Sequence, residues 1–221
     1  MLNVFPPCLD ILPEPQRRLW PELATTPDHF VLYGGTAIAL RLGHRQSVDF
    51  DFFSQRTFEP RSLLETVPYL KGATVRRSAP DDLTVTVDRG GPVQLSFFGN
   101  LGLGQVADAE LAEGPRFKVA TLIDLAGMKV AVVTQRAEVK DYLDIDALLT
   151  KSGLPLASML AAGAIIYGSQ FNPLLSLKAI SYHEDANLAG LPMSVRKRLS
   201  EAVHKTDPAK LPSLKAVRVR G

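Results

Sequence analysis

The chain has 221 residues, of which 46% are hydrophobic and 22% are charged, and this composition indicates a folded globular protein rather than a disordered one. The longest apolar stretches, such as MLAAGAII (159–166), reach about half the length that a membrane helix needs. Cys8 is the single cysteine, which excludes an internal disulfide and a cysteine-based zinc site. With no secretion signal in the first residues, we expect a cytoplasmic protein.

Charge is distributed unevenly along the chain. The formal net charge is +2, but residues 1–150 carry a net charge of −4 and residues 151–221 a net charge of +6. Two interpretations fit the basic C-terminal third: a solvated helix face or tail, and a patch that meets a polyanion such as RNA.

The first half of the chain alternates helical and extended patterns. The predicted elements are a helix over 14–23, a strand over 29–33, a helix over 36–42, a strand over 47–53, a helix over 60–70, and strands over 73–78, 83–88 and 92–98. Asp81-Asp82 and Gly90-Gly91 predict hairpin turns between the last three strands.

The second half of the chain is helical. Helices are predicted over 121–136, 139–153, 156–168, 173–183 and 194–205. Strands that come first and helices that come later favour an α+β protein, with an α/β core over 1–110 and a helical lobe over 111–221.

Two acidic residues, Asp49 and Asp51, interrupt the apolar segment VDFDFF. Residues two apart on a strand project to the same face, so these carboxylates lie together while the intervening phenylalanines point into a core. Two adjacent carboxylates repel each other, and Mg²⁺ binds through one or two carboxylates together with substrate phosphates. The alternative interpretation is a pair of solvated acids, or acids paired with Arg41 and Arg45.

A glycine pair precedes the carboxylates. A strand that runs through Gly34-Gly35-Thr36 into a helix presents unpaired backbone N–H groups at the positive end of the helix, where a phosphate binds well. Glycine lets the backbone approach a phosphate closely, and Thr36 adds a hydroxyl. Neither element is specific alone, and the G-x-G-x-x-G pattern of a dinucleotide loop is absent.

Together, GGTAIAL…GHRQSVDFDFF (34–53) and DLAGMKVAVVTQRAEVKDYLDIDALL (124–149) resemble the AbiEii/AbiGii toxin family of nucleotidyltransferases, within the DNA polymerase beta-like superfamily. The resemblance covers roughly residues 29–150. It implies a small mixed-sheet nucleotidyltransferase core followed by a helical lobe, and a bacterial toxin with an antitoxin partner.

The same resemblance implies an activity and its site residues. The activity is transfer of NMP from an NTP to an acceptor hydroxyl, dependent on Mg²⁺ or Mn²⁺. Asp49 and Asp51 are the expected metal ligands and catalytic residues. The expected nucleotide-binding residues of the first segment are Gly34, Gly35, Thr36 and Arg45.

The second segment carries further candidates. Lys129 lies in an apolar helix, where a buried ammonium needs an anionic partner; contact with a phosphate and extension to solvent are the two interpretations. Arg136 lies two turns further on the same helical face. By themselves Lys140, Asp141 and Asp144 fit an ordinary exposed salt-bridge face. The resemblance favours a catalytic role for Lys129 and nucleotide binding by the other four.

One feature departs from the polymerase beta-like pattern, which has a third carboxylate on a later strand. The corresponding segment, PVQLSFF (92–98), offers Ser96 where an acid is expected. Asp88, Asp141 and Asp144 are the alternative sources of that carboxylate.

Three hypotheses follow for the function. The first is nucleotidyl transfer to an RNA hydroxyl, with the 3′ end of tRNA as the leading acceptor. The second is the same chemistry on a small molecule or a protein. The third is an NTP-binding protein whose site is degenerate, because the third acid is missing.

Overall fold

The computed structural model describes residues 2–220, which form two compact units. The first unit contains the residues up to Gly102 together with Ala109–Ala120. The second contains Leu103–Asp108 together with the residues from Thr121 onward. The sequence predicts a single boundary at residue 110. In the structure the chain crosses between the units three times, after residues 102, 108 and 120.

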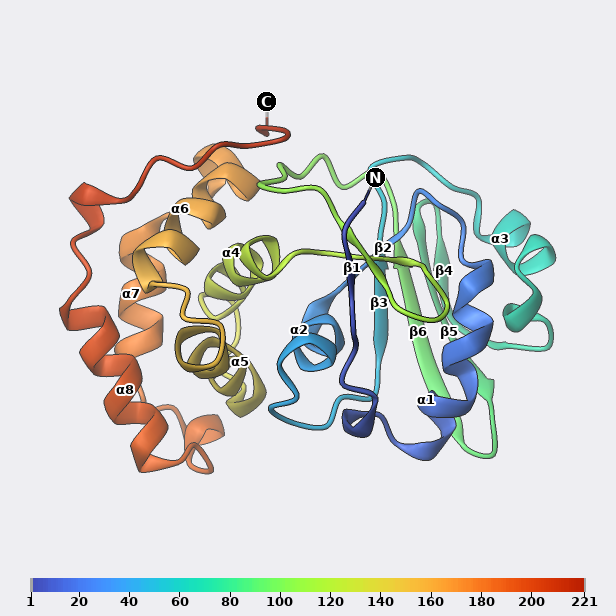
Figure 1. The fold of residues 1–221 in the computed structure, drawn as a ribbon, viewed down its shortest axis with the longest axis horizontal. Coiled ribbons are helices and arrows are strands. Elements are labelled where there is room, and N and C mark those ends of the chain that lie inside the picture. The colour runs from blue at the N-terminus through green and yellow to red at the C-terminus, as the bar shows by residue number, and fades with distance from the viewer. Residues whose placement is uncertain (1, 221) are drawn as a thin grey trace. The chain divides into compact units, whose positions relative to one another are not determined.

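The first unit is built around one mixed sheet (Figure 1). Its strands are β1 (Val4–Phe5), β2 (Val31–Tyr33), β3 (Phe50–Phe53), β4 (Thr74–Ala79), β5 (Asp82–Asp88), β6 (Pro92–Phe98), β7 (Glu110–Ala112) and β8 (Lys118–Val119). Its α-helices are α1 (Glu14–Leu19), α2 (Gly34–Leu42) and α3 (Pro60–Thr66), and its 3₁₀ helices are η1 (Leu9–Ile11), η2 (Trp20–Thr25) and η3 (Pro68–Leu70).

The strand order of the sheet is β1-β7-β8-β2-β3-β6-β5-β4. Strand β3 lies in the interior of the sheet, antiparallel to β2 and parallel to β6. Strands β4, β5 and β6 form an antiparallel meander whose tight turns match the turn residues in the sequence.

One face of this sheet carries the hydrophobic core of the first unit. Phe50 and Phe52 of β3 are fully buried on it, and the ring of Phe52 stacks on Phe97 of β6 with centroids 5.2 Å apart. Phe30 meets Phe97 edge-to-face at 5.2 Å. The alternation of buried and partly exposed residues along β3 is the period-two pattern that the sequence predicts.

The opposite face carries Asp51, and we call it the Asp51 face. Helix α2 packs against β2 and β3 and lies on the other side of the sheet from α1 and α3 (Figure 1). Arg41 fixes the helix to the sheet, because its buried guanidinium donates to Glu110 at 2.5 Å and to the carbonyl of Ala120 at 2.9 Å.

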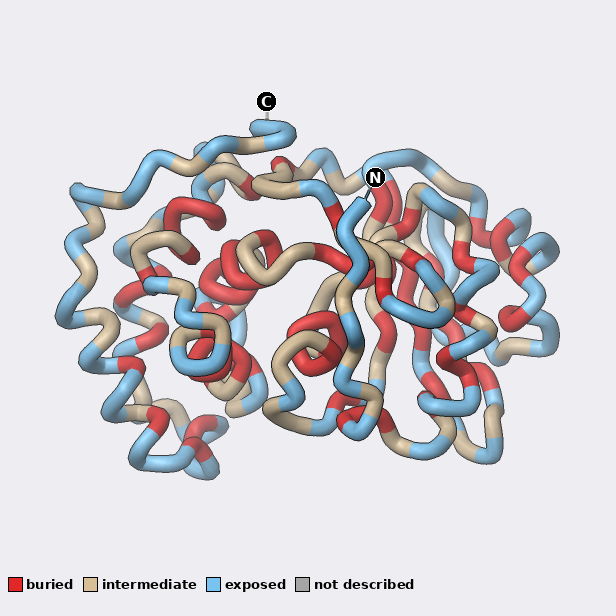
Figure 2. Tube along the Cα trace, viewed as in Figure 1, coloured by how far each residue is buried: buried red, intermediate tan, exposed pale blue. Residues whose placement is uncertain are grey.

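The second unit is helical. Its elements are α4 (Leu122–Val132), α5 (Val139–Thr150), α6 (Leu156–Tyr167), α7 (Pro173–Ser181) and α8 (Met193–His204), with the 3₁₀ helices η4 (Gly168–Gln170), η5 (Ala186–Leu188) and η6 (Pro208–Lys210). Most of α4 is buried (Figure 2). Its Gly127 lies so close to α6 that an added Cβ would be 2.8 Å from the backbone carbon of Ala162.

The prediction of an α+β protein is confirmed. All five helices expected after residue 120 are present, with ends shifted by up to four residues. The short strands β1, β7 and β8 were not predicted. None of the helices in residues 2–220 has the length and apolarity to cross a bilayer.

Candidate functional site

The two predicted metal-binding carboxylates lie where β3 begins. Asp51 is on β3, directly opposite Tyr33 of β2 and beside Ser96 of β6. Asp49 precedes the strand by one residue, and both acids are partly exposed. The register therefore places Asp51 on the side of the sheet away from the core, as the sequence predicts.

Gly34 lies against the Asp51 carboxylate. It has a φ of +75°, and a Cβ added to it would lie 2.8 Å from the Asp51 Oδ2 atom. A side chain at this position would both strain the backbone and enter the space beside the carboxylate. The glycine therefore brings the N-terminus of α2 directly to the candidate metal ligand.

Helix α2 begins without a side-chain cap. It has neither a capping hydrogen bond at Tyr33 nor an acidic residue in its first turn. The first N–H groups of a helix lack intrahelical partners, and the helix dipole makes this end positive. The backbone of Gly34, Gly35 and Thr36 is therefore suited to an anion.

The Thr36 hydroxyl has a different environment from the one expected for a phosphate ligand. Thr36 is 2% exposed, and its Oγ1 lies 2.7 Å from the Ser47 Oγ and donates to the carbonyl of Asp49. These bonds fix the segment that carries Asp49. Ser47 was missed by the sequence reasoning, because no local pattern predicts a serine that meets a threonine 11 residues away.

The carboxylate oxygens of Asp49 and Asp51 are ligands that suit a hard divalent cation. Two carboxylates supply part of the oxygen coordination of Mg²⁺ or Mn²⁺, and substrate phosphates and water supply the rest. In residues 2–220 no group of three or more His, Cys, Asp or Glu side chains is arranged to hold a metal. The residues present fit a metal that arrives with a triphosphate better than one held by the protein alone.

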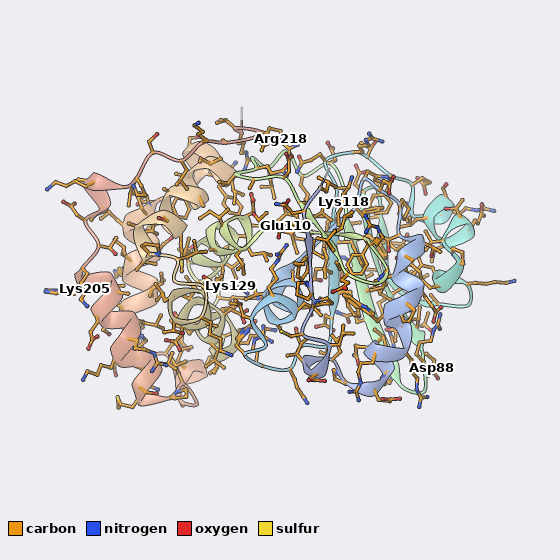
Figure 3. The ribbon with its side chains drawn as sticks, viewed as in Figure 1. Asp88, Glu110, Lys118, Lys129, Lys205 and Arg218 are labelled. Atoms are coloured by element: carbon orange, nitrogen blue, oxygen red, sulfur yellow. The ribbon has the colours of Figure 1, made fainter. Side chains whose placement is uncertain are left out.

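The position beside Asp51 on β6 belongs to Ser96, which is 5% exposed. Asp88 is paired with Pro92, which lies four residues before Ser96 on β6. That corresponds to about 13 Å along the strand. Asp88 lies at the β5–β6 hairpin end (Figure 3), where its Oδ1 accepts from the N–H groups of Gly90 and Gly91 at 2.8 and 2.9 Å. Asp88 is therefore a turn residue and a poor substitute for the third carboxylate.

Arg45 lies in the loop between α2 and β3. It is partly exposed, and its Nη1 donates to the carbonyl of Gln46 at 2.9 Å. It shares the first unit with Gly34, Asp49 and Asp51.

The second unit brings together the candidates from α4 and α5. Lys129 of α4 is labelled in Figure 3, and its side chain is 8% exposed. Its Nζ atom lies 2.8 Å from Asp141 Oδ1 and 2.9 Å from Asp144 Oδ2. Arg136 donates to both oxygens of Asp141 through Nε at 2.8 Å and Nη2 at 3.1 Å. Both carboxylates are fully buried, so we call these four residues the buried ion cluster.

Two opposing effects set the pKa of Asp141. Burial raises it, but the hydrogen bonds from Arg136 and the charge of Lys129 outweigh burial and hold the pKa below its usual range. The carboxylate is therefore charged at neutral pH, and Lys129 has the anionic partners that a buried ammonium requires.

Two cations at this cluster reach solvent. The side chains of Arg136 and Lys140 are 46% and 51% exposed, and Lys140 forms an ion pair with Glu138 at 2.9 Å. The i,i+3 spacing of Asp141 and Asp144 predicts their proximity, whereas their contact with Lys129 depends on packing between two helices.

A cavity of about 560 Å³ lies elsewhere in the first unit. Its lining residues are Pro6, Pro7, Leu9, Trp20, Pro21, Ala24, Glu113, Gly114 and Pro115. None of the predicted site residues belongs to this lining.

Comparison with known proteins gives a family match. Residues 18–207 match the model of the family described as nucleotidyl transferase AbiEii toxin, type IV toxin–antitoxin system. An uncharacterized protein of Aquifex aeolicus (strain VF5) is 29% identical over 159 residues, which cover 71% of this chain and 75% of that protein.

Two solved structures have a similar fold. A protein from H. pylori assigned to the nucleotidyltransferases aligns with a TM-score of 0.55 at 18% identity, covering 86% of this chain and 91% of that chain. The nucleotidyltransferase toxin MenT4 of Mycobacterium tuberculosis H37Rv aligns with a TM-score of 0.53 at 16% identity, covering 88% of this chain and 83% of that chain.

Proposed function

The chain belongs to the AbiEii family of nucleotidyltransferase toxins from type IV toxin–antitoxin systems, and on that basis we propose that it transfers NMP from a metal-bound NTP to an RNA hydroxyl. The observation that carries the proposal is the contact of Gly34 with Asp51, which joins an uncapped helix N-terminus to a carboxylate pair. The type IV family also implies an antitoxin as the partner of this protein.

Asp49 and Asp51 hold the divalent metal in this proposal. A divalent metal held there with the triphosphate would neutralise charge on the α-phosphate and on the leaving pyrophosphate. The backbone N–H groups of Gly35 and Thr36 at the start of α2 bind a non-transferred phosphate. Arg45 adds positive charge from the same unit.

The proposed reaction exchanges one P–O bond for another. The acceptor hydroxyl oxygen attacks the α-phosphorus, and the bond from that phosphorus to the oxygen bridging to the β-phosphate breaks. Pyrophosphate leaves with the electron pair, and the hydroxyl proton passes to a base or to water. Ser96 is not that base, because a neutral hydroxyl has little affinity for a proton.

Two cations of the second unit are exposed, Arg136 in the buried ion cluster and Lys140 beside it. Arg136 and Lys140 reach solvent, where an anion can approach them, whereas Lys129 is enclosed by Asp141 and Asp144. We expect Lys129 to act on the reaction by fixing this cluster. Asp141 and Asp144, the other two candidates for the third carboxylate, are fully buried and paired with Lys129, so neither is an accessible base.

RNA is the proposed acceptor because the last third of the chain is basic, with a net charge of +6 over residues 151–221. A small-molecule or protein acceptor uses the same nucleotide site, so the acceptor requires a direct test.

The test uses wild-type protein, Asp49→Asn/Asp51→Asn, and Asp28→Asn as a control for loss of an exposed carboxylate in the same unit. Each is incubated with Mg²⁺, one α-labelled NTP at a time, and either total RNA or protein extract. We expect label in RNA with wild type and the control, and loss of that label in the double variant.

Other outcomes are distinct. Label in protein but not in RNA would reject the RNA acceptor and retain nucleotidyl transfer. Binding of NTP without label in either pool would favour the degenerate-site hypothesis, which the Ser96 position motivates. Label that is equal in wild type and in the double variant would reject the assigned carboxylates.

A further inference from the structure

Three aromatic rings form a continuous row on the Asp51 face. Tyr33 of β2 stacks on Phe53 of β3 with centroids 5.0 Å apart and planes 20° apart. Phe53 meets Phe98 of β6 edge-to-face at 5.5 Å. All three residues are partly exposed, in contrast to the fully buried rings of the core face.

The sheet register explains this row. Tyr33 pairs with Asp51, Phe53 lies two residues after Asp51, and Phe98 is the β6 partner of Phe53. Directly paired residues and residues two apart share a face, so the rings lie on the same side as the carboxylate. The Cα atoms of Asp51 and Phe53 are about 7 Å apart, the rise of two residues on a strand.

A β-bulge adds two arginines to the same face. The register of β4 against β5 shifts between Val75 and Arg77, so Arg76 has no direct partner. Arg76 Nε donates to the Thr86 hydroxyl at 3.2 Å, and Arg77 Nε donates to Asp82 at 3.0 Å. Thr86 and Asp82 are both on the Asp51 face, so two consecutive side chains extend to one side, which a regular strand does not allow.

Arg77 connects the basic pair to the aromatic row. Its Cζ lies 5.7 Å from the centroid of the Phe98 ring, within cation–π range. The Arg77–Asp82 ion pair is solvent-exposed, with the Arg77 side chain 57% exposed. The pair is bidentate, and it uses Nε and Nη2 of a group that has five N–H donors.

We propose that this surface, defined by Tyr33, Phe53, Phe98, Arg76 and Arg77, binds the single-stranded end of the RNA acceptor. The rings stack on unpaired bases, and the two arginines contact the phosphates that follow. The proposal rests on the proposed function, since it takes RNA to be the acceptor.

Two properties of the surface select single-stranded RNA. A row of aromatic rings with adjacent arginines is the combination that binds unpaired bases and the phosphate backbone together. Bases in a duplex are stacked on each other and leave no face for a protein ring. The row also begins beside Asp51, so a strand on it has its end at the proposed metal.

The experiment measures binding of a fluorescein-labelled single-stranded RNA of about 12 nucleotides by anisotropy. The variants are Arg76→Gln/Arg77→Gln and Phe98→Leu. Phe98→Tyr keeps the aromatic ring, and Arg61→Gln removes an arginine that is 85% exposed on α3. Binding of an Mn²⁺-bound non-hydrolysable NTP, and the thermal transition, are measured for every variant.

The expected result is specific to RNA. The double arginine variant weakens RNA binding and lowers the log–log salt slope by about 1.4, since each phosphate contact on a single strand contributes about 0.7. Phe98→Leu weakens binding by roughly 5- to 100-fold, the effect of losing one base–ring stack. Phe98→Tyr, Arg61→Gln and nucleotide binding match wild type.

Three results overturn the inference. If both test variants bind RNA as wild type does, or if an RNA duplex of the same length binds more tightly than the single strand, the surface is not an acceptor site. If wild type itself neither binds nor labels RNA, the RNA acceptor of the proposed function also fails. That failure appears in the wild-type protein, which distinguishes it from failure of this surface alone.

Discussion

Replacing Gly34 with alanine tests the geometry of the proposed metal site at a single atom. The new Cβ would lie 2.8 Å from the Asp51 Oδ2 atom, closer than van der Waals contact allows. This oxygen is the terminal atom of a side chain that can rotate. We therefore expect the carboxylate to move away while the fold is kept. The φ of +75° adds a backbone penalty of about 1–2 kcal/mol for alanine.

These two effects predict two separate measurements. The backbone penalty lowers the melting temperature by about 2–8 °C for a chain of this length. A displacement of order 1 Å at a reacting centre costs about 100-fold in rate, so label transfer falls by about that factor.

Gly72→Ala is the matched control. Gly72 has a φ of +78° in the same unit, and nothing lies within 4 Å of its added Cβ. It carries the same backbone strain without the contact with Asp51. If Gly34→Ala transfers label as well as Gly72→Ala does, the role assigned to Asp51 is incorrect.

Three further predictions concern the second unit. Asp141→Asn leaves the buried Lys129 with one carboxylate fewer. We expect it to lower the free energy of unfolding, measured by urea titration, by about 3–5 kcal/mol. An unchanged free energy would show that the cluster is solvated rather than buried. Because the pKa of Asp141 is lowered in the folded state, its stabilisation is complete above the unfolded-state pKa of about 4 and is lost as pH falls through the folded-state pKa. Stability measured below about pH 4 should therefore fall more steeply in wild type than in Asp141→Asn, and parallel curves would contradict this assignment. Gly127→Ala should lower the free energy of unfolding by about 1–3 kcal/mol, because the added Cβ would lie 2.8 Å from the backbone of Ala162. A more stable variant would show that the higher helix propensity of alanine outweighs this close contact.

Much of the fold follows from local patterns. The β4–β6 meander was predicted because its strands alternate and its turns contain Asp81 and Gly90-Gly91. The two-residue period around Asp51 predicted which side chains turn away from the core. Strands β1, β7 and β8 have only two or three residues each, too few for a periodic pattern.

The candidate site was predictable only in part. The sequence indicates Gly34 and the carboxylate pair, but not that the Thr36 hydroxyl is used to hold the Asp49 segment. It places Lys129 in an apolar helix, but its enclosure by two carboxylates of α5 depends on tertiary packing. The bulge at Arg76 is likewise a property of strand pairing, which no local pattern in β4 records.

The proposed activity requires that Asp49 and Asp51 hold a metal together with the triphosphate. Electron paramagnetic resonance of Mn²⁺, titrated with protein and a non-hydrolysable NTP, measures this directly. We predict that wild type and Asp28→Asn remove the free Mn²⁺ signal in the presence of the nucleotide, and that Asp49→Asn/Asp51→Asn does not. Equal loss of the signal in the double variant would contradict the claim.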